Sequence, residues 1–131
     1  MKTLIGFLLL FAFVLFAQGC ATPEQQMKDS GAELLTQSEL EELFSVDRTA
    51  RIVANKGTTV TVSYSPGGSQ KVTYAGGSDE GSYRFDNGMF CSKWNKIRDG
   101  KEKCGRFYKI DENEYVSVSS DGKNSIKIYF D

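Results

Sequence analysis

The sequence from Arg51 onward consists of short segments in which apolar and polar residues alternate. Val60, Val62 and Tyr64, for example, are separated by threonine and serine. A period of two residues places alternate side chains on opposite faces of a strand, so each segment predicts a half-buried β-strand. The expected strands, about eight in all, are residues 51–53, 59–64, a segment beginning at 72, then 82–86, 89–94, 104–110, 115–119 and 125–130.

Turn signals separate most of these segments. They are Ser65-Pro66-Gly67-Gly68, Gly76-Gly77, Asn87-Gly88 and Asp121-Gly122. Asn-Gly is the strongest of them, because both central residues of a two-residue hairpin turn need a positive φ. Strands joined by such short turns pair antiparallel with their neighbours in sequence. We therefore predict a mainly β fold, an antiparallel meander of about eight strands that closes into a barrel rather than a sandwich with long crossovers.

One short helix is expected before the first strand. Thr36 and Glu39 have the spacing of a capping box, in which the threonine hydroxyl accepts from the backbone at Glu39 and the glutamate side chain reaches back. Leu35 can pack on Leu40, and the helix is expected to run to about Phe44. The predicted barrel is thus preceded by one short N-terminal helix.

The first 19 residues have the pattern of an export signal. A basic start at residues 1–3 is followed by an unbroken apolar run at 4–16 and a junction of small residues that ends in Gly19. The run is too short to span a bilayer comfortably, and no basic stop-transfer flank follows it. We therefore expect residues 1–19 to be cleaved and the mature protein to work outside the cytoplasm.

Cys20 stands directly after the expected cleavage point. The junction resembles the lipobox of bacterial lipoproteins, which implies that Cys20 is acylated and becomes the new N-terminus. Ordinary signal peptidase would cut the same bond and leave Cys20 unmodified. The chain has three cysteines, and in an oxidising compartment Cys91 and Cys104 can pair, so acylation of Cys20 explains the odd count. We expect a lipid-anchored protein of the bacterial cell envelope that faces the periplasm, and a soluble periplasmic or secreted protein is the alternative.

The mature chain is one small domain. Residues 20–34 are polar, carry Pro23 and lack periodicity over 21–30, so we expect a flexible tether before a barrel domain at residues 35–131. The 16 basic and 17 acidic side chains of the whole chain lose only Lys2 with the signal, which leaves a net charge of about −2. This balance and the expected compartment argue against a nucleic-acid partner.

Part of the sequence resembles a bacterial family of small secreted proteins that contain a domain of unknown function. The matching features are the strand Gly81-Ser82-Tyr83-Arg84-Phe85, the turn at Asn87-Gly88, Cys91 close to Trp94, and Cys104 opening a strand with aromatic residues. The resemblance covers about residues 35 to 125. It implies a lipocalin-like β-barrel, and because the family has no established activity it implies no particular function.

Catalytic patterns are missing from the chain. The sequence has no histidine, which excludes Ser-His and Cys-His dyads and histidine-based zinc sites. The spacing of Cys91 and Cys104 is wider than in redox motifs. Asp79-Glu80 and Asp111-Glu112-Asn113 are expected in solvated turns rather than in a carboxylate pair or a calcium loop. We predict a protein that is not an enzyme and that has no cofactor or metal.

A basic region is the first candidate binding feature. Between residues 93 and 109 seven basic side chains accompany two acidic ones, and the local charge is about +5. Lys96, Arg98 and Lys101 are the candidate contacts to an anionic component of the envelope, a lipid headgroup or an acidic protein. The alternative is a solvated hairpin whose charges keep an exposed strand edge from aggregating.

Phe90 and Trp94 are the second candidate, because they share one face of a strand while Cys91 lies on the other. Such a pair belongs to the core or lines a small apolar pocket.

The function that best fits is a noncatalytic envelope lipoprotein acting as a binding or structural module, with a small apolar molecule or a protein as its partner. The alternative is a periplasmic inhibitor of a lysozyme-like or other hydrolase, in which the loop at residues 92–103 enters a cleft. A weak hydrolase is disfavoured by the missing histidine.

Overall fold

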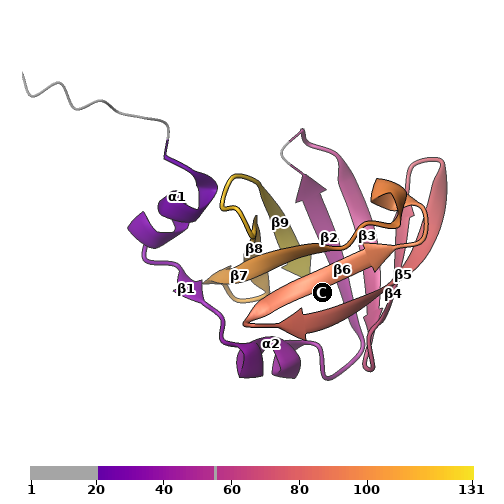
Figure 1. The fold of residues 1–131 in the computed structure, drawn as a ribbon, viewed down its shortest axis with the longest axis horizontal. Coiled ribbons are helices and arrows are strands. Elements are labelled where there is room, and N and C mark those ends of the chain that lie inside the picture. The colour runs from indigo at the N-terminus through magenta and orange to yellow at the C-terminus, as the bar shows by residue number, and fades with distance from the viewer. Residues whose placement is uncertain (1–20, 55) are drawn as a thin grey trace, which may run out of the picture.

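The computed structural model describes residues 21–54 and 56–131, and they form nine antiparallel strands, two short α-helices and one 3₁₀ helix (Figure 1). The expected signal peptide and Cys20 lie outside the described residues. The strands are β1 (Glu33–Leu34), β2 (Arg48–Ala54), β3 (Thr59–Ser65), β4 (Ser69–Tyr74), β5 (Gly77–Asp86), β6 (Met89–Trp94), β7 (Lys103–Asp111), β8 (Glu114–Ser119) and β9 (Ser125–Phe130). The helices are α1 (Pro23–Asp29), α2 (Gln37–Leu43) and the 3₁₀ helix η1 (Ile97–Gly100).

Strands β2 to β9 close into a barrel of eight strands. Each strand pairs antiparallel with its neighbours in sequence. In addition, β2 pairs with β9, and this pairing closes the ring. The short strand β1 is an addition. Strand β6 pairs with the start of β7, at residues 103–105, and β1 pairs with its later part, at Tyr108 and Lys109. Next to this pairing, the N–H of Leu35 donates to the carbonyl of Phe107 at 2.9 Å. The predicted meander and its closure into a barrel are confirmed.

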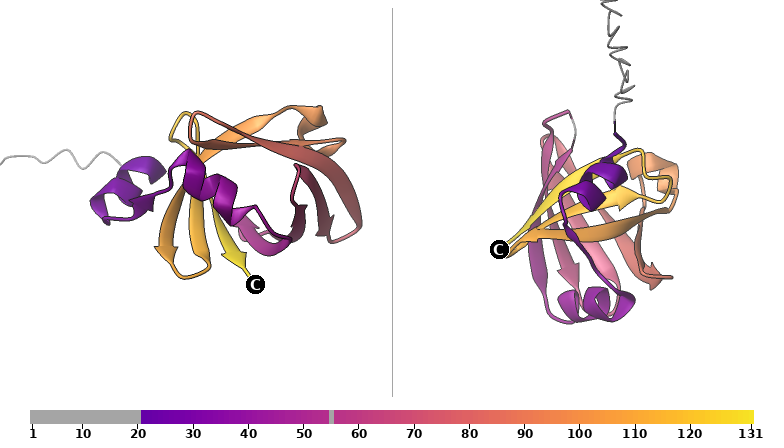
Figure 2. Two further views of the ribbon diagram at one scale, coloured as in Figure 1. Left: turned by 90° about the horizontal axis from the view of Figure 1, so that it is seen from below. Right: turned by 90° about the vertical axis from the view of Figure 1, so that its left-hand side faces the viewer.

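Helix α2 closes one end of the barrel (Figure 2). The predicted capping box is present, since Thr36 Oγ1 accepts from the Glu39 N–H at 3.2 Å and Glu39 Oε1 accepts from the Thr36 N–H at 3.1 Å. Leu40 is fully buried beneath the helix, and Phe44 follows at its C-terminal end with 3% of its surface exposed. The capping residues therefore position the helix so that two large apolar side chains enter the barrel.

Aromatic rings fill the interior at this end. The Phe44 ring lies 4.9 to 5.9 Å, between centroids, from six other rings. Those rings belong to Tyr64, Tyr83, Phe85, Phe90, Phe107 and Phe130. Such edge-on and offset contacts are the preferred arrangements of aromatic side chains, and each adds to the stabilisation from burial. The barrel interior near α2 is a packed core.

Several strands are longer than predicted, and β5 differs most. It begins at Gly77 and includes Ser78, Asp79 and Glu80, whose polarity obscured the strand. Gly81 lies at the centre of this strand, and a side chain there would collide with the backbone of Lys93 on β6. The alternating pattern of a strand would need an apolar residue at position 81, but the close approach of β5 and β6 leaves room only for glycine there.

The segment expected to be a flexible tether contains helix α1, which is docked on the outside of the barrel. Met27 and Ala32 pack against Tyr108, Val116 and Val118, which point outward from β7 and β8. The prediction of an irregular segment was wrong at residues 23–29, because Pro23 occupies the first turn of a helix, where its missing N–H costs nothing, and Thr22 caps it.

Candidate functional site

Phe90 and Trp94 lie in the barrel core, and each exposes only 8% of its surface. The Phe90 ring stacks on Phe44 and on Tyr83, with centroid distances of 4.9 and 5.3 Å. Cys91 points to the opposite face of β6, as the alternation predicted. Both aromatic residues therefore serve packing, and the structure supports the core interpretation of this pair over a ligand pocket.

The three basic candidates of the loop between β6 and β7 have different surroundings. Lys96 and Lys101 are exposed, and their charges face solvent. Arg98 is half-buried and donates from its guanidinium to the carbonyl of Ser92 at 3.4 Å and to its hydroxyl at 3.1 Å. Burial lowers the pKa of Arg98 from its ordinary value. Arg98 thus fastens the loop to β6, and only the two lysines are available to a partner.

Asp79 organises the same loop, and the sequence interpretation missed it. Its side chain is 5% exposed, and its Oδ2 atom accepts from the backbone N–H groups of Lys96 at 2.8 Å and Ile97 at 2.9 Å. Its Oδ1 atom accepts from the Glu80 N–H at 2.8 Å. The expectation of a solvated turn was wrong, because Asp79 lies in β5 and points toward the start of η1. No spacing rule marks such a residue in the sequence.

The contacts of Asp79 also determine its charge. Burial raises the pKa of the carboxyl, but the three N–H donors and the nearby Lys96 charge lower it more, so the pKa lies below the ordinary value of 3.8. A carboxyl with a depressed pKa in the folded state stabilises that state above its ordinary pKa, and this contribution is lost as the pH falls through the folded-state value. The ionised form therefore holds the loop at all pH values above about 3.8.

We expect Asp79→Asn to loosen the loop while the barrel stays folded. The amide has one acceptor oxygen in place of two, so either the Glu80 N–H or both the Lys96 and Ile97 N–H groups lose their acceptor. Even where the oxygen still faces Lys96 and Ile97, the bonds weaken because the acceptor is no longer charged. Hydrogen exchange at these two amides should become faster at pH 7. As a control, Asp121→Asn removes the carboxyl that accepts from Ser119 and from the Lys123 N–H in another turn, and it should leave both amides unchanged. Unchanged exchange in Asp79→Asn would contradict the assigned role.

The disulfide and an ion pair hold the base of the loop. Cys91 and Cys104 are bonded and lie opposite each other in the β6–β7 register. Arg84 on β5 donates to both oxygens of Glu102, from Nε at 3.0 Å and from a terminal guanidinium nitrogen at 2.6 Å. The hydrogen bond from Arg84 lowers the pKa of Glu102. The sulfur atoms of the two cysteines and a Glu102 oxygen lie within 4.8 Å of one another, but the disulfide consumes both thiolates that a metal would need.

Two depressions lie on the outer surface. One, of about 460 Å³, lies between residues 30–33 and 109–112. The other, of about 370 Å³, lies beside α2 and is lined in part by Phe44, Tyr83 and Phe85. The second also has Glu41 and Arg84 in its lining, but both depressions are open to solvent, whereas small-molecule sites bury most of their ligand. Among the described residues, each helix is too short or too polar to cross a bilayer.

Comparison with known proteins adds no relative to this description. No family model, no curated protein and no solved structure matches the chain significantly. The resemblance to secreted lipocalin-like proteins therefore stays a prediction.

Proposed function

We propose that this chain is a noncatalytic lipoprotein of the bacterial cell envelope, anchored through Cys20, whose barrel is a small structural or protein-binding module. The observation that carries the proposal is the packed interior. Eight-stranded barrels are just wide enough to hold side chains or one small ligand, and here the rings around Phe44 occupy the space. A small apolar ligand inside the barrel is thereby disfavoured, and the outer surface is the favoured contact.

The environment of the carboxylates supports a noncatalytic role. The most buried of them, Asp79, is held by three backbone N–H groups, and Glu24 and Glu102 are each held by an arginine. General acid–base catalysis needs a titratable group poised near the working pH and within reach of a substrate. The pKa values of Asp79 and Glu102 are instead shifted down, which keeps both charged and structural.

We expect Cys20→Ala to abolish acylation and with it the lipid-mediated association with membranes. An acyl chain at Cys20 would bring the domain to the bilayer, whereas the barrel has no spanning helix among its described residues. The wild-type protein should sediment with membranes and dissolve in detergent. The variant should be recovered as soluble or unprocessed protein. A Ser38→Ala variant, changed at an exposed position of α2, should behave as the wild type does.

Mass spectrometry of the native protein tests the same proposal directly. Recovery of the wild type wholly in the soluble fraction, with an unmodified cysteine at its N-terminus, would reject the anchor. The same spectrum would report any retained ligand and the oxidation state of Cys91 and Cys104.

A second candidate function, inhibition of a lysozyme-like hydrolase, is favoured by the rigidity of the loop at residues 95–102. Asp79, Arg98 and the disulfide fasten this loop at three points. A binding loop that is already ordered loses less conformational entropy when it enters a cleft. The soluble domain should then inhibit lysozyme, and Lys96→Gln with Lys101→Gln should weaken the inhibition. Full lysozyme activity in the presence of excess domain would reject this function.

A further inference from the structure

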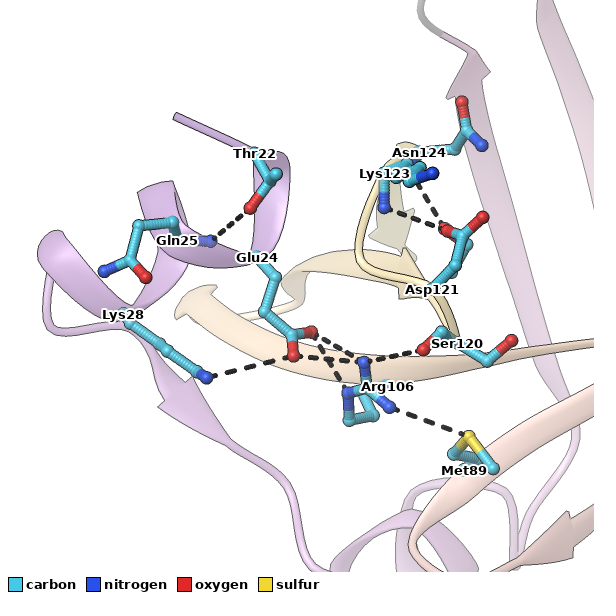
Figure 3. A network of polar contacts seen from close by, with 11 residues as sticks. Thr22, Glu24, Gln25, Lys28, Met89, Arg106, Ser120, Asp121, Lys123 and Asn124 are labelled. Carbon is cyan, nitrogen blue, oxygen red and sulfur yellow. Dashed lines mark hydrogen bonds and ion pairs between the residues drawn. The ribbon is translucent and has the colours of Figure 1, made fainter. Parts of the chain in front are cut away.

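Helix α1 is fastened to the barrel close to the position of Cys20 in the sequence (Figure 3). Both carboxylate oxygens of Glu24 accept from the Arg106 guanidinium at 3.0 Å, and Arg106 also donates to the carbonyl of Ser120 at 3.2 Å. The Glu24 N–H lies 3.4 Å from the carbonyl of Gly122 in the β8–β9 turn. Glu24 and Arg106 are both largely shielded from solvent, with 19% and 26% of their side-chain surfaces exposed. The helix is thus a fixed part of the barrel.

Very little chain separates this helix from Cys20. Only Ala21 and Thr22 lie between Cys20 and Pro23, the first residue of α1. Consecutive Cα atoms are 3.8 Å apart, so Cys20 lies at most about 11 Å from Pro23. The polar headgroup layer on one side of a bilayer is itself roughly 5 to 8 Å thick. An acyl chain on Cys20 would therefore hold the barrel against the headgroups, with almost no intervening water.

The position of α1 decides which end of the barrel meets the membrane. Figure 1 and the right-hand view of Figure 2 place the start of α1 at the end opposite α2, and the contact of Glu24 with Gly122 places it beside the β8–β9 turn. The same end carries the β2–β3 turn and the η1 loop. We call it the basic end, because its loops carry the exposed lysines Lys56, Lys96, Lys101 and Lys123. The exposed carboxylates in these loops are Asp99, Glu102 and Asp121, and Glu102 is paired with Arg84.

The opposite end of the barrel has the opposite charge. Carboxylates gather on α2, on its connection to β2, on the β5–β6 and β7–β8 turns and at the C-terminal residue. They are Glu39, Glu41, Glu42, Asp47, Asp86, Asp111, Glu112, Glu114 and Asp131. The net charge of about −2 of the mature chain thus conceals a strong separation of charge along the barrel axis.

We propose that α1 holds the basic end against anionic phospholipid headgroups, so that the anchored barrel has one orientation with α2 pointing away from the membrane. This inference rests on the proposed anchor at Cys20. Screening in physiological salt confines the attraction to about 8 Å, which is comparable with the span of at most about 11 Å between Cys20 and Pro23. The orientation turns the η1 loop toward the bilayer, which disfavours the inhibitor function, and it leaves the α2 end as the face that other proteins can reach.

The test attaches the mature chain, residues 20–131, through Cys20 to a short maleimide lipid in nanodiscs. Cys20 is the only thiol outside the disulfide, so coupling is specific. The nanodiscs contain phosphatidylglycerol and a trace of gadolinium-chelating lipid, which broadens the NMR signals of nearby amides. Amides at Lys56, Lys96 and Lys123 should broaden several-fold more than those at Glu41 and Asp86. Equal broadening at both ends, or stronger broadening at α2, would overturn the proposed orientation.

Matched variants separate the two parts of the mechanism. Replacing all four lysines of the basic end by glutamine should reduce the difference in broadening between the two ends, and retention of the full difference would overturn the role of charge. The control Lys71→Gln, Lys109→Gln, Lys127→Gln removes exposed lysines elsewhere and should retain the difference. Glu24→Gln should also reduce it, because α1 loses its ion pair to Arg106. Chemical coupling makes these results independent of acylation in the cell, which the Cys20→Ala experiment tests alone.

Discussion

Replacement of Phe44 by alanine should lower the free energy of unfolding by about 3 to 5 kcal/mol. The side chain is 97% buried, since only 3% of it is exposed, and its ring contacts six others across the barrel. Truncation loses the transfer free energy of the ring and leaves a cavity that the strands cannot collapse to fill, because the barrel is closed by hydrogen bonds. A domain of this size has a total stability of only about 5 to 15 kcal/mol, so the loss is a large fraction of it.

Urea denaturation of the mature domain measures this effect. The transition midpoint should fall strongly, whereas Glu42→Ala on the exposed side of α2 should change the unfolding free energy by less than about 0.5 kcal/mol. A loss below about 1 kcal/mol for Phe44→Ala would mean that α2 does not close the barrel as described. Because α2 is capped by its own residues, the variant should lose packing without losing the helix start.

The meander was predictable because its turns and its strands give independent signals. Alternation at Val60, Val62 and Tyr64 identifies a strand, and Asn87-Gly88 identifies where a hairpin must reverse. Closure of β2 onto β9 is a pairing between residues about 75 positions apart, and it follows only from the number of strands and their twist. The capping box at Thr36 was equally local, and its hydrogen bonds are present as expected.

The missed elements depend on contacts between distant parts of the chain. Helix α1 needs Arg106 and the outward-facing apolar residues of β7 and β8, none of which is near it in sequence. A threonine before Pro23 followed by Glu24 was the available signal, but the segment is polar and lacks apolar periodicity, so it was interpreted as a tether. The start of strand β5 was missed because Asp79 interrupts its apolar pattern. A buried aspartate is possible there only because the η1 loop supplies N–H donors.

The candidate site was predicted by charge but not by geometry. The sequence shows that basic residues concentrate between 93 and 109, but it cannot show that Arg98 turns back onto Ser92 while Lys96 remains exposed. Separation of charge between the two barrel ends was also invisible, because the acidic residues come from loops spread over the whole chain. Alternate loops of a meander gather at the same end, so a charge pattern distributed along the sequence becomes a polarity in space.

Removal of the disulfide by Cys91→Ala with Cys104→Ala should cost about 2 to 4 kcal/mol and leave the barrel fold unchanged. The bridge closes a loop whose ends are 13 residues apart, and in the chain-entropy model such a loop restricts the unfolded chain by about 3 kcal/mol. Alanine is the right replacement at Cys91, because this residue is fully buried and a serine hydroxyl there would need a partner.

The double variant also changes packing, and reduced wild-type protein separates that effect from the loss of the cross-link. Both proteins lack the bridge, so the part of the stability loss that they share measures how much the bridge restricts the unfolded chain. The remainder measures the packing lost with the two sulfur atoms. The native loop should persist in both, because Asp79 and the Arg84–Glu102 pair still hold it. Thiol-reactive labelling should modify neither Cys91 nor Cys104 in the native, nonreduced protein. Labelling of both residues there would show that the bridge does not form, and the expected stability loss would then have no basis.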